Sequence, residues 1–320
     1  MKAIVYTEYG PPDVVLQLKE LEKPAPKDNE ILIKVLAASV NAADVHFTRG
    51  TPFVVRTESG LRKPKNTRMG IDFAGRVEAV GKDVRQFNVG DEVFGIRTGA
   101  FAEYVIKLEK TLVLKPANLT FEQAAAIPVA ACTALQGLRD KGHLQPGQTV
   151  LINGAAGGVG TFAVQIAKAL GGHVTGVCST GKVEMVRSIG ADRVIDYTQE
   201  DFTRGGERYD LILDIVGNHS LSASRRVLSP TGVIVLVAAP VSRMLTALLR
   251  ARFGQKDQVA FVTSVTKDDL VFLKELSEAG KLTPVIDRRY GLNEVPEAIR
   301  YLEEGHARGK VVIDVESHVQ

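Results

Sequence analysis

The chain of 320 residues has no tryptophan, only two cysteines and no long unbroken apolar run. Cys132 and Cys178 cannot form a disulfide framework, so we expect a reduced, cytoplasmic protein. The longest apolar stretches, 124–131 and 232–241, are each interrupted by proline and fall short of the roughly 18 residues that cross a bilayer. The first residues turn polar too soon for a signal peptide. We therefore expect no membrane span.

A strong charge of either sign is also absent. The chain has 40 Lys and Arg against 37 Asp and Glu, a formal net charge of +3. This balance lacks the dense basic stripe typical of nucleic-acid binding, so we expect no nucleic-acid partner, but it suits an anionic cofactor. The 45% hydrophobic and 24% charged residues are typical of a globular protein, and the length allows two domains.

The first third of the chain has the composition of β-structure. Runs rich in valine and isoleucine between turn residues predict strands at 2–7, 31–39, 73–80 and 92–96. The basic stretch 56–68 has no periodicity and is predicted to be a mobile surface loop. At 120–123 the letters TFEQ form a capping-box pattern, which predicts the start of an alanine-rich helix.

From residue 148 onward, predicted strands alternate with helices. The strands are expected at 149–152, 173–177, 193–195, 209–216, 232–238 and 259–263, and helices at 159–170 and 182–189. This alternation predicts a doubly wound parallel sheet and an α/β fold. Residues 284–320 return to strand and turn character around a helix at 295–304. We expect a β-rich domain of residues 1–120, completed by 284–320, and a dinucleotide-type domain of residues 121–283.

A glycine-rich turn at 154–160, GAAGGVG, joins a predicted strand directly to a predicted helix. This succession is the phosphate-binding unit of a Rossmann fold, because glycine lets the backbone approach a pyrophosphate and the helix N-terminus carries partial positive charge. The strict fingerprint begins with glycine, where this chain has Ala155. A tight turn without a ligand is the alternative interpretation.

The end of the second predicted strand indicates which dinucleotide is preferred. NAD-binding folds carry a carboxylate there for the ribose 2′-hydroxyl, whereas this chain has none until Glu184. Ser179, Thr180 and Lys182 instead favour a 2′-phosphate, and therefore NADPH. The alternative is that Lys182 is a solvated lysine, although a cation at a helix start opposes the helix dipole.

Several separate motifs give the chain a family resemblance. It resembles the quinone-oxidoreductase-like branch of the medium-chain dehydrogenase/reductase superfamily over nearly its whole length, at GIDFAGRV (70–77), FNVGDEVFG (87–95), GAFAEY (99–104), CTAL (132–135), the glycine turn, 190–197 and GKVV (309–312). The resemblance implies a GroES-like N-terminal domain completed by the tail, a Rossmann domain, and a cleft between them for nicotinamide and substrate. It also implies a homodimer.

The resemblance implies roles for individual residues as well. Ala156, Gly158 and Val159 would line the pyrophosphate, and Ser179, Lys182 and Tyr197 would hold the 2′-phosphate end. Asn41 and Thr133 would lie beside the nicotinamide. The cofactor-binding residues that we predict are Asn41, Thr133, Ala156, Gly157, Gly158, Val159, Ser179, Thr180, Lys182, Tyr197, Val216, Phe261, Val262 and Lys310.

The ligands of a zinc site are missing from the sequence. Zinc alcohol dehydrogenases of this superfamily have a cysteine near 41–44 and Gly-His-Glu where this chain has Gly70-Ile71-Asp72. The four-cysteine structural lobe is absent too, so we expect no zinc. Without a Lewis acid, the favoured reaction is hydride transfer from NADPH to a small lipophilic quinone or to the β-carbon of an α,β-unsaturated carbonyl (an enone).

Three points stay open in the sequence. Asn41, Asp44 and His46 are the candidate catalytic residues, but His46 is alternatively a packed or surface histidine and water an alternative proton source. Residues 241–253 mix arginines with apolar residues, which fits either a surface for a membrane or acidic partner, or the border of the substrate cleft. A non-enzymatic NADPH-binding sensor, structural or RNA-associated protein is the alternative function.

Overall fold

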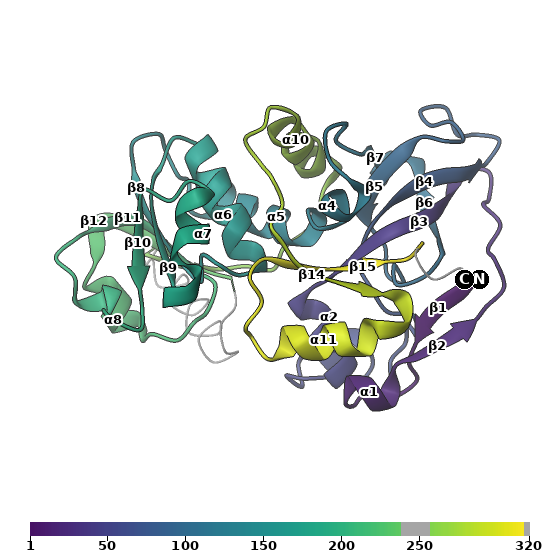
Figure 1. Cartoon of the computed structure of the whole chain (residues 1–320), viewed down its shortest axis with the longest axis horizontal. Coiled ribbons are helices and arrows are strands. Elements are labelled where there is room, and N and C mark those ends of the chain that lie inside the picture. Colours follow the sequence, from purple (N-terminus) through teal and green to yellow (C-terminus); the bar gives the residue numbers. More distant parts are fainter. Residues whose placement is uncertain (238–256, 317–320) are drawn as a thin grey trace. The chain divides into compact units, whose positions relative to one another are not determined.

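The computed structural model describes residues 1–237 and 257–316 (Figure 1). They form two compact units. Unit 1 comprises Met1–Val129, Val265–Glu278 and Pro284–Gln320, and unit 2 comprises Ala130–Ser264 and Ala279–Thr283. The domain boundaries predicted at residues 120 and 283 stay a prediction. Residues 241–253, whose role was left open, lie outside the described residues.

Unit 1 is built on a seven-stranded sheet that the C-terminal tail completes. Its order is β14-β15-β3-β4-β5-β7, and β6 also pairs with β3. Val311 of β15 lies opposite Val40 of β3 in an antiparallel register. The strands are β3 (Glu30–Val40), β4 (Asp72–Val80), β5 (Glu92–Ile96), β6 (Tyr104–Leu108), β7 (Val113–Leu114), β14 (Ile286–Gly291) and β15 (Lys310–Asp314), beside a separate pair, β1 (Lys2–Val5) and β2 (Gln17–Glu20).

Short helices surround this sheet, and its core is strongly apolar. Phe73, Phe101 and Val311 are fully buried there. The capping box predicted at Thr120 is confirmed, because its side chain accepts a hydrogen bond from the Gln123 amide. The helices are α1 (Pro12–Val15), α2 (Ala42–Arg49), α3 (Val55–Ser59), α4 (Phe121–Ala125), α10 (Lys267–Glu278) and α11 (Val295–Glu303), with single 3-10 turns at Glu109–Thr111 and Leu292–Glu294.

Several stretches of unit 1 differ from the prediction, among them helix α2 and strands β2, β6 and β7, which were not expected. The stretch 56–68, expected to be an unpatterned loop, begins inside helix α3. Local hydrogen bonds explain this, since Arg56 donates to the Gly50 carbonyl at 2.8 Å and Gly60 N–H closes the helix on the Arg56 carbonyl. Helix α10 was not expected from the sequence at all.

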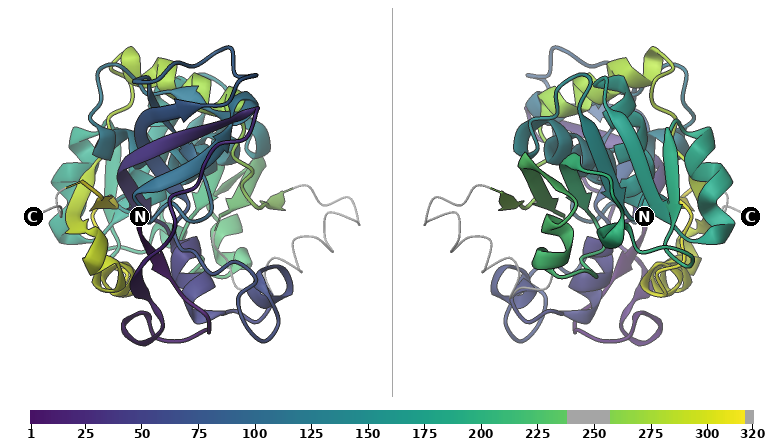
Figure 2. Two further views of the ribbon diagram at one scale, coloured as in Figure 1. Left: turned by 90° about the vertical axis from the view of Figure 1, so that its right-hand side faces the viewer. Right: turned by 90° about the vertical axis from the view of Figure 1, so that its left-hand side faces the viewer.

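Unit 2 has the predicted doubly wound parallel sheet, and Figure 2 shows its strands side by side in teal and green. The order is β10-β9-β8-β11-β12-β13, and every neighbouring pair is parallel. The strands are β8 (Thr149–Asn153), β9 (His173–Cys178), β10 (Arg193–Asp196), β11 (Tyr209–Asp214), β12 (Leu228–Leu236) and β13 (Gln258–Ala260). The chain reverses its direction of growth between β8 and β11, which makes this the switch point of the sheet.

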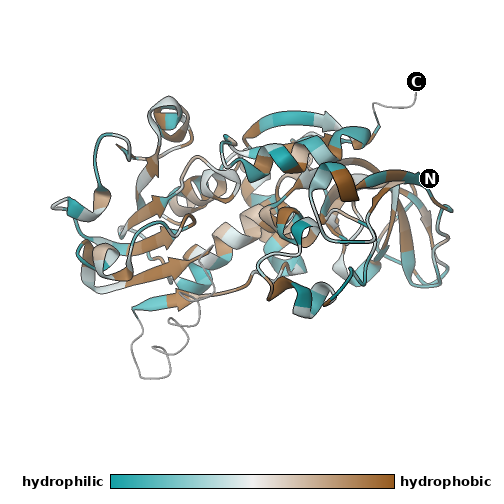
Figure 3. Ribbon diagram, turned by 90° about the horizontal axis from the view of Figure 1, so that it is seen from below, coloured by the Kyte–Doolittle hydropathy of each residue, from teal (hydrophilic) through white to brown (hydrophobic). Residues whose placement is uncertain are grey.

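The central strands of unit 2 are largely apolar, as Figure 3 shows by their brown colour, and consecutive residues of β8 and of β11 are buried. Parallel strands covered by helices on both faces are expected to have such continuous apolar runs. The helices are α5 (Pro128–Leu135), which begins in unit 1, α6 (Gly158–Ala169), α7 (Val183–Ser188) and α8 (Leu221–Arg225), with a π-helical turn at Gln136–Lys141 and 3-10 turns at Thr180–Lys182 and Phe202–Arg204. Within the described residues, no helix is long and apolar enough to cross a membrane.

Candidate functional site

The glycine turn lies at the carboxyl edge of the parallel sheet, between β8 and α6. Gly154 has φ +92°, a left-handed conformation that glycine adopts without strain. A Cβ on Gly160 would lie 2.0 Å from the Gly154 carbonyl oxygen, so only glycine allows this close packing of turn and helix. Helix α6 starts at Gly158, and its first turn contains no acidic residue. Its first amides have no acceptor inside the helix, which makes this end suited to an anion.

The alanine that departs from the glycine fingerprint is explained by its neighbour on β9. Ala155 is fully buried. Its methyl group packs over Gly176, where an added Cβ would lie 3.0 Å from the Ala155 Cβ. The left-handed conformation belongs to Gly154, so the position of Ala155 does not need glycine. The turn therefore keeps the tight geometry of the motif, because the absence of a side chain at Gly176 leaves room for the methyl group of Ala155.

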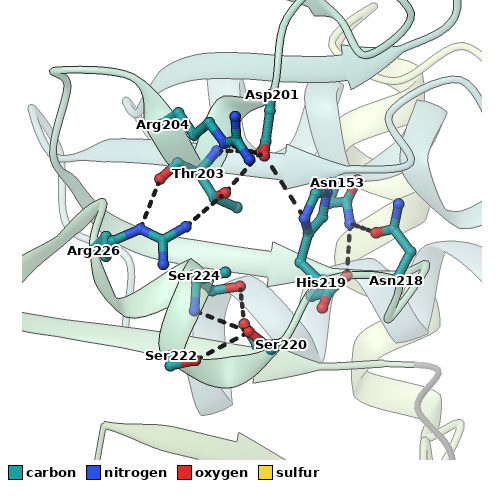
Figure 4. A network of polar contacts seen from close by, with 12 residues as sticks. Asn153, Asp201, Thr203, Arg204, Asn218, His219, Ser220, Ser222, Ser224 and Arg226 are labelled. Carbon is teal, nitrogen blue, oxygen red and sulfur yellow. Dashed lines mark hydrogen bonds and ion pairs between the residues drawn. The ribbon is translucent and has the colours of Figure 1, made fainter.

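A polar pair joins the two strand ends at the switch point. The Asn153 side-chain amide donates to Asp214 Oδ1 at 2.8 Å, and it donates to Asn218 Oδ1 at 2.9 Å (Figure 4). The same Asp214 oxygen accepts the Gly217 amide at 2.8 Å. Val216 then lies against the turn, since a Cβ on Gly154 would come within 2.8 Å of its methyl carbon. This pair fixes the loop after β11 onto the glycine turn.

Sequence reasoning missed Asn153 and Asp214 as site residues. Each is buried and ends an apolar strand, Val150-Leu151-Ile152-Asn153 and Leu211-Ile212-Leu213-Asp214. The polar residue at the end of each buried apolar run is a signal that could have identified them. Parallel strands end at the same edge of a sheet, the carboxyl edge, where ligands bind. Their pairing across the switch point depends on the strand order, which no local pattern gives.

The predicted 2′-phosphate residues are brought together at the ends of β9 and β10. Cys178 lies opposite Asp196 in the sheet, and the Tyr197 amide donates to the Cys178 carbonyl at 3.0 Å. Ser179, Thr180 and Lys182 follow directly on β9, and the Tyr197 side chain is exposed.

The same edge carries a carboxylate that sequence reasoning missed. Asp196 Oδ1 accepts the Thr198 hydroxyl at 2.8 Å and the Thr198 amide at 3.0 Å. Hydrogen bonds from Thr180 and Thr198 lower the pKa of Asp196, so this carboxyl is ionised at neutral pH. An anion and the Lys182 cation therefore flank this end of the sheet.

Thr133 is linked to the loop after β13. Its hydroxyl is 2.7 Å from the Thr263 hydroxyl, and Gln136 Nε2 donates to the Ser264 carbonyl at 2.7 Å. These bonds hold the loop that contains Phe261 and Val262 against the α5 segment. Val262 is strongly exposed on that loop. The structure thus groups the predicted residues Thr133, Phe261 and Val262 in one part of unit 2.

Unit 1 contains a separate, fully buried polar cluster. Lys310 Nζ on β15 donates to Asn41 Oδ1 at 2.7 Å and to the Val40 carbonyl at 3.1 Å, and lies 3.8 Å from Asp72 Oδ2. The Asp72 carboxylate accepts Asn41 Nδ2 at 2.9 Å and the Ser39 hydroxyl at 3.1 Å. We call Ser39, Asn41, Asp44, Asp72 and Lys310 the buried charge cluster.

Asp44 is the second carboxyl of this cluster. Its Oδ2 accepts the Asn41 amide at 2.8 Å at the start of α2. Its Oδ1 is buried and has no hydrogen-bond partner among the described residues. Burial raises the pKa of Asp44 to about 7, against the Asn41 hydrogen bond that lowers it, and the negative charge of Asp72 raises it further.

The other two ionisable groups are perturbed by the same desolvation. Burial raises the pKa of Asp72, although the Lys310 ammonium and the Asn41 and Ser39 hydrogen bonds oppose this shift. Burial lowers the pKa of Lys310, and the two carboxylates oppose that shift. The cluster combines two carboxyls with one ammonium, so full ionisation would leave one uncompensated negative charge in the interior.

The three candidate catalytic residues are not all in this cluster. Asn41 and Asp44 belong to it, whereas His46 lies on the exposed side of α2. His46 Nδ1 is 2.9 Å from the Thr51 carbonyl oxygen of the following loop. This placement fits the surface histidine that was the alternative interpretation.

Residues 1–237 and 257–316 contain no group of three or more His, Cys, Asp or Glu that could hold a metal ion. The position of a zinc-ligand histidine is occupied by Ile71, and Asp72 faces the Lys310 ammonium instead of a metal. The prediction that this protein works without zinc stays a prediction.

Comparison with known proteins identifies the family. A model of the alcohol dehydrogenase GroES-like domain matches residues 27–117, and a model described as zinc-binding dehydrogenase matches residues 189–313. The chain is 36% identical to a tomato (Solanum lycopersicum) 2-methylene-furan-3-one reductase, over 98% of this chain and 79% of the relative. It is 31% identical to an Arabidopsis thaliana chloroplast envelope quinone oxidoreductase homolog, over 98% of both chains.

Solved structures agree with this assignment. The quinone oxidoreductase of Coxiella burnetii superposes with a TM-score of 0.88 at 34% identity, over 99% of both chains. The Escherichia coli quinone oxidoreductase complexed with NADPH has a TM-score of 0.82 at 25% identity, over 98% of this chain and 100% of that one. The chain therefore belongs to the quinone-oxidoreductase-like branch of the medium-chain dehydrogenase/reductase superfamily, and it is an oxidoreductase.

Proposed function

We propose that this oxidoreductase is an NADPH-dependent reductase that acts without zinc on a small lipophilic quinone or on the double bond of an enone. The observation that carries the proposal is the open N-terminus of α6 directly after β8, at the carboxyl edge of a parallel sheet. The names of relatives support it, since an Arabidopsis protein 35% identical to this chain is an NADPH-dependent alkenal/one oxidoreductase.

The residues of unit 2 fit a dinucleotide. Gly154 and Gly160 give the tight turn, and the amides at Gly158 and Val159 belong to the first turn of α6, where they have no acceptor inside the helix and suit a pyrophosphate. When bound, the nicotinamide supplies a hydride. The Asn153–Asp214 pair holds the loop with Val216 against the glycine turn. The segments that follow β8 and β11 are therefore positioned before a ligand binds.

Preference for the phosphorylated cofactor depends on two opposing charges. Lys182 and the hydroxyl of Ser179 favour a 2′-phosphate, and the Asp196 carboxylate disfavours it. The Asp196 oxygen is already engaged by the hydroxyl and amide of Thr198, which reduces its demand for a ribose hydroxyl. We therefore assign the preference to NADPH, with Asp196 limiting its strength.

The reaction adds a hydride and a proton across the acceptor, and the oxidised dinucleotide is the second product. Within unit 1, the ammonium of Lys310 supplies the positive charge beside Asp72, so this carboxylate has a counter-charge without a metal. Asn41 and Asp44 stay the catalytic candidates, and water is the alternative proton source. His46 has no part in the proposal.

A turnover assay tests this function. The purified protein is mixed with NADPH and, separately, with a panel of small quinones and a panel of 2-alkenals, and absorbance of the reduced nicotinamide is followed. We expect oxidation with at least one panel, unchanged after dialysis against a chelator. Tight NADPH binding without turnover on any acceptor would contradict the reductase, and activity that a chelator abolishes and zinc restores would contradict the zinc-free mechanism.

A pair of variants tests the cofactor preference. Lys182→Ala removes a cation and should weaken NADPH binding about tenfold while leaving NADH binding unchanged. Asp196→Asn removes an anion from the same edge and should strengthen NADPH binding several-fold. Calorimetric titration with both dinucleotides measures these changes. If NADH binds the unaltered protein as tightly as NADPH, the 2′-phosphate assignment is wrong.

A further inference from the structure

One short segment of unit 1 concentrates positive charge. Residues 53–68, which we call the basic loop, carry one carboxylate, Glu58, and five cations, Arg56, Arg62, Lys63, Lys65 and Arg68. Subtracting them from the 40 Lys and Arg and 37 Asp and Glu of the whole chain leaves 35 cations and 36 anions, a net charge of −1. The positive field of the protein therefore has a local source that the mean composition hides.

The charges of the basic loop are not neutralised by neighbours. Among the described residues, none of its five cations lies within 4.0 Å of a carboxylate oxygen. Some other surface cations of unit 1 are paired, such as Arg49 with Glu303 at 2.7 Å and Arg300 with Asp13 at 3.1 Å. Arg62, Lys63 and Lys65 are exposed, so their charge is available to a partner.

Large apolar side chains are exposed among these cations. Phe53 is 67% exposed, Leu61 59% and Val54 50%. By contrast, Phe73, Phe94 and Phe101 of the same unit are fully buried. An exposed aromatic ring beside aliphatic and basic side chains is the composition of a surface that enters the interfacial zone of a membrane.

The basic loop is held in a defined shape. The Tyr9 hydroxyl donates to the Gly60 carbonyl at 2.6 Å and is 2.8 Å from the Ser59 hydroxyl. The Arg56 guanidinium stacks on the Tyr9 ring, 4.6 Å from its centroid, and donates to the Gly50 carbonyl. Figure 2 shows this dark blue segment at the lower edge of both views. The exposed side chains of Phe53, Val54 and Leu61 therefore belong to a segment that is already ordered, which reduces the conformational entropy lost on docking.

We propose that the basic loop docks unit 1 on an anionic membrane surface. Phe53 and Leu61 enter the headgroup region, and Arg62, Lys63 and Lys65 lie against lipid phosphates. Polybasic segments are attracted to anionic leaflets, and buried apolar area adds to the binding. A nucleic acid would use the cations but not the aliphatic side chains of Val54 and Leu61, so the observations favour lipid. This inference rests on the surface alone, independently of the proposed reaction.

Vesicle sedimentation tests the docking with the full chain. One set of vesicles contains about 30 mol% phosphatidylglycerol in phosphatidylcholine, and the other only phosphatidylcholine. We expect binding to the anionic vesicles at least about tenfold tighter than to the neutral ones, and release as salt shortens the screening length. Equal binding to both sets, or no binding to either, would overturn the proposal.

A charge variant with a matched control locates the surface. The triple change Arg62→Gln, Lys63→Gln, Lys65→Gln should weaken anionic-vesicle binding about a hundredfold. Lys19→Gln, Lys110→Gln, Lys281→Gln removes the same charge from exposed positions elsewhere and should weaken it only several-fold. Equal losses in the two variants would show that net charge, and not the basic loop, drives binding.

An apolar variant separates lipid from other anionic partners. Phe53→Ser should weaken vesicle binding about tenfold, and Val89→Ser, at a site 65% exposed outside the loop, should leave it unchanged. All variants should keep the thermal midpoint of the unaltered protein within about 2 °C, since the changed side chains are exposed. The membrane proposal would be contradicted if only the charge variant lost binding, if Phe53→Ser bound vesicles as tightly as the unaltered protein, and if single-stranded RNA bound as tightly as vesicles. Those results together would identify a general polyanion site.

Discussion

The two units each bury an aspartate at a polar site but stabilise it in opposite ways. In unit 2, Asp214 accepts the backbone amide of Gly217 and the side-chain amide of Asn153, which are neutral donors. In unit 1, Asp72 faces the full positive charge of Lys310, and a second carboxyl, Asp44, shares the same interior. Unit 2 thus stabilises its carboxylate with fixed dipoles, and unit 1 with a counter-charge.

This difference predicts what can disturb each unit. Of the two donors to Asp214, the Gly217 amide belongs to the backbone and cannot be deleted by one substitution, and neither donor carries a charge that changes with pH. The counter-charge of Asp72 depends on a single side chain and on pH. Unit 1 should therefore respond strongly to loss of a charge or to a change in protonation. Unit 2 should respond mainly to changes in packing and backbone geometry.

Lys310→Met should have the largest effect on stability. It leaves two buried carboxyls without their cation, which we expect to cost about 3–5 kcal/mol of unfolding free energy. Urea denaturation measures the loss. The double variant Lys310→Met, Asp72→Asn should recover most of it, because the uncompensated charge is then gone. Additive losses in the double variant would show that the two side chains do not interact.

Asp44→Asn should change the pH dependence of stability. The pKa of Asp44 is raised from 3.8 to about 7 in the folded protein, so the folded state holds this proton more tightly than the unfolded state. The stability that this proton gives is present below pH about 4 and is lost as pH rises to about 7, by roughly 4 kcal/mol.

The Asp44→Asn variant lacks this loss. The difference between its unfolding free energy and that of the unaltered protein should therefore shift in favour of the variant between about pH 4 and 7, and should be constant above about pH 7. Tyr6, Asp72 and Lys310 are the ionisable groups that interact electrostatically with Asp44, and all three are present in both proteins. Urea titrations between pH 4 and 8 test the prediction. Asp83→Asn, at an exposed position, is the control and should leave the profile unchanged. A pH-independent offset for Asp44→Asn would contradict it.

Asp214→Ala should cost about 2 kcal/mol in unit 2, because it leaves the Asn153 and Gly217 donors without this acceptor. We also expect weaker NADPH binding, since the loop with Val216 loses its attachment to the glycine turn. Asp214→Asn keeps one acceptor oxygen and should recover about half of the stability. Denaturation and titration calorimetry measure the two effects. Unchanged cofactor affinity would show that the pair has only a structural role.

Gly176→Ala should have the smallest effect, a loss of about 1 kcal/mol. Its new methyl group would lie 2.7 Å from Val186 Cγ1 and 3.0 Å from the Ala155 Cβ, contacts that small shifts of side chains can relieve. Adding Ala155→Gly should restore part of the stability by vacating one of the two contacts. A neutral Gly176→Ala would mean that the strand tolerates both methyl groups.

Much of the fold was predictable because its signals are local. The capping box at Thr120, the strand at Glu92–Ile96 and the switch from β-runs to a parallel alternation all follow from short-range patterns. The glycine turn was predictable for the same reason. Helix α10 was not expected, although the sequence has a start signal for it that our prediction overlooked. Thr266 precedes the helix, and its hydroxyl accepts the Asp269 amide at 3.1 Å.

The parts of the site that escaped prediction depend on distant pairings. Lys310 and Asn41 are 269 positions apart in sequence, so their contact exists only because β15 joins β3. The Asn153–Asp214 pair likewise requires β8 and β11 to be neighbours. Ala155 looked like a defect in the motif because the compensating residue, Gly176, lies on another strand.

The pairing of β15 with β3 also sets an order for biosynthesis. Strand β3 leaves the ribosome early, yet its neighbour and the cation of the buried charge cluster both come from Lys310–Asp314. Until those residues emerge, Asp44 and Asp72 have no ammonium partner, and hydration of these carboxyls opposes closure of the first sheet. The continuous stretch that forms most of unit 2 is complete by Ser264. The nascent chain should therefore complete its second unit before its first, in the reverse of the order in which they are encoded.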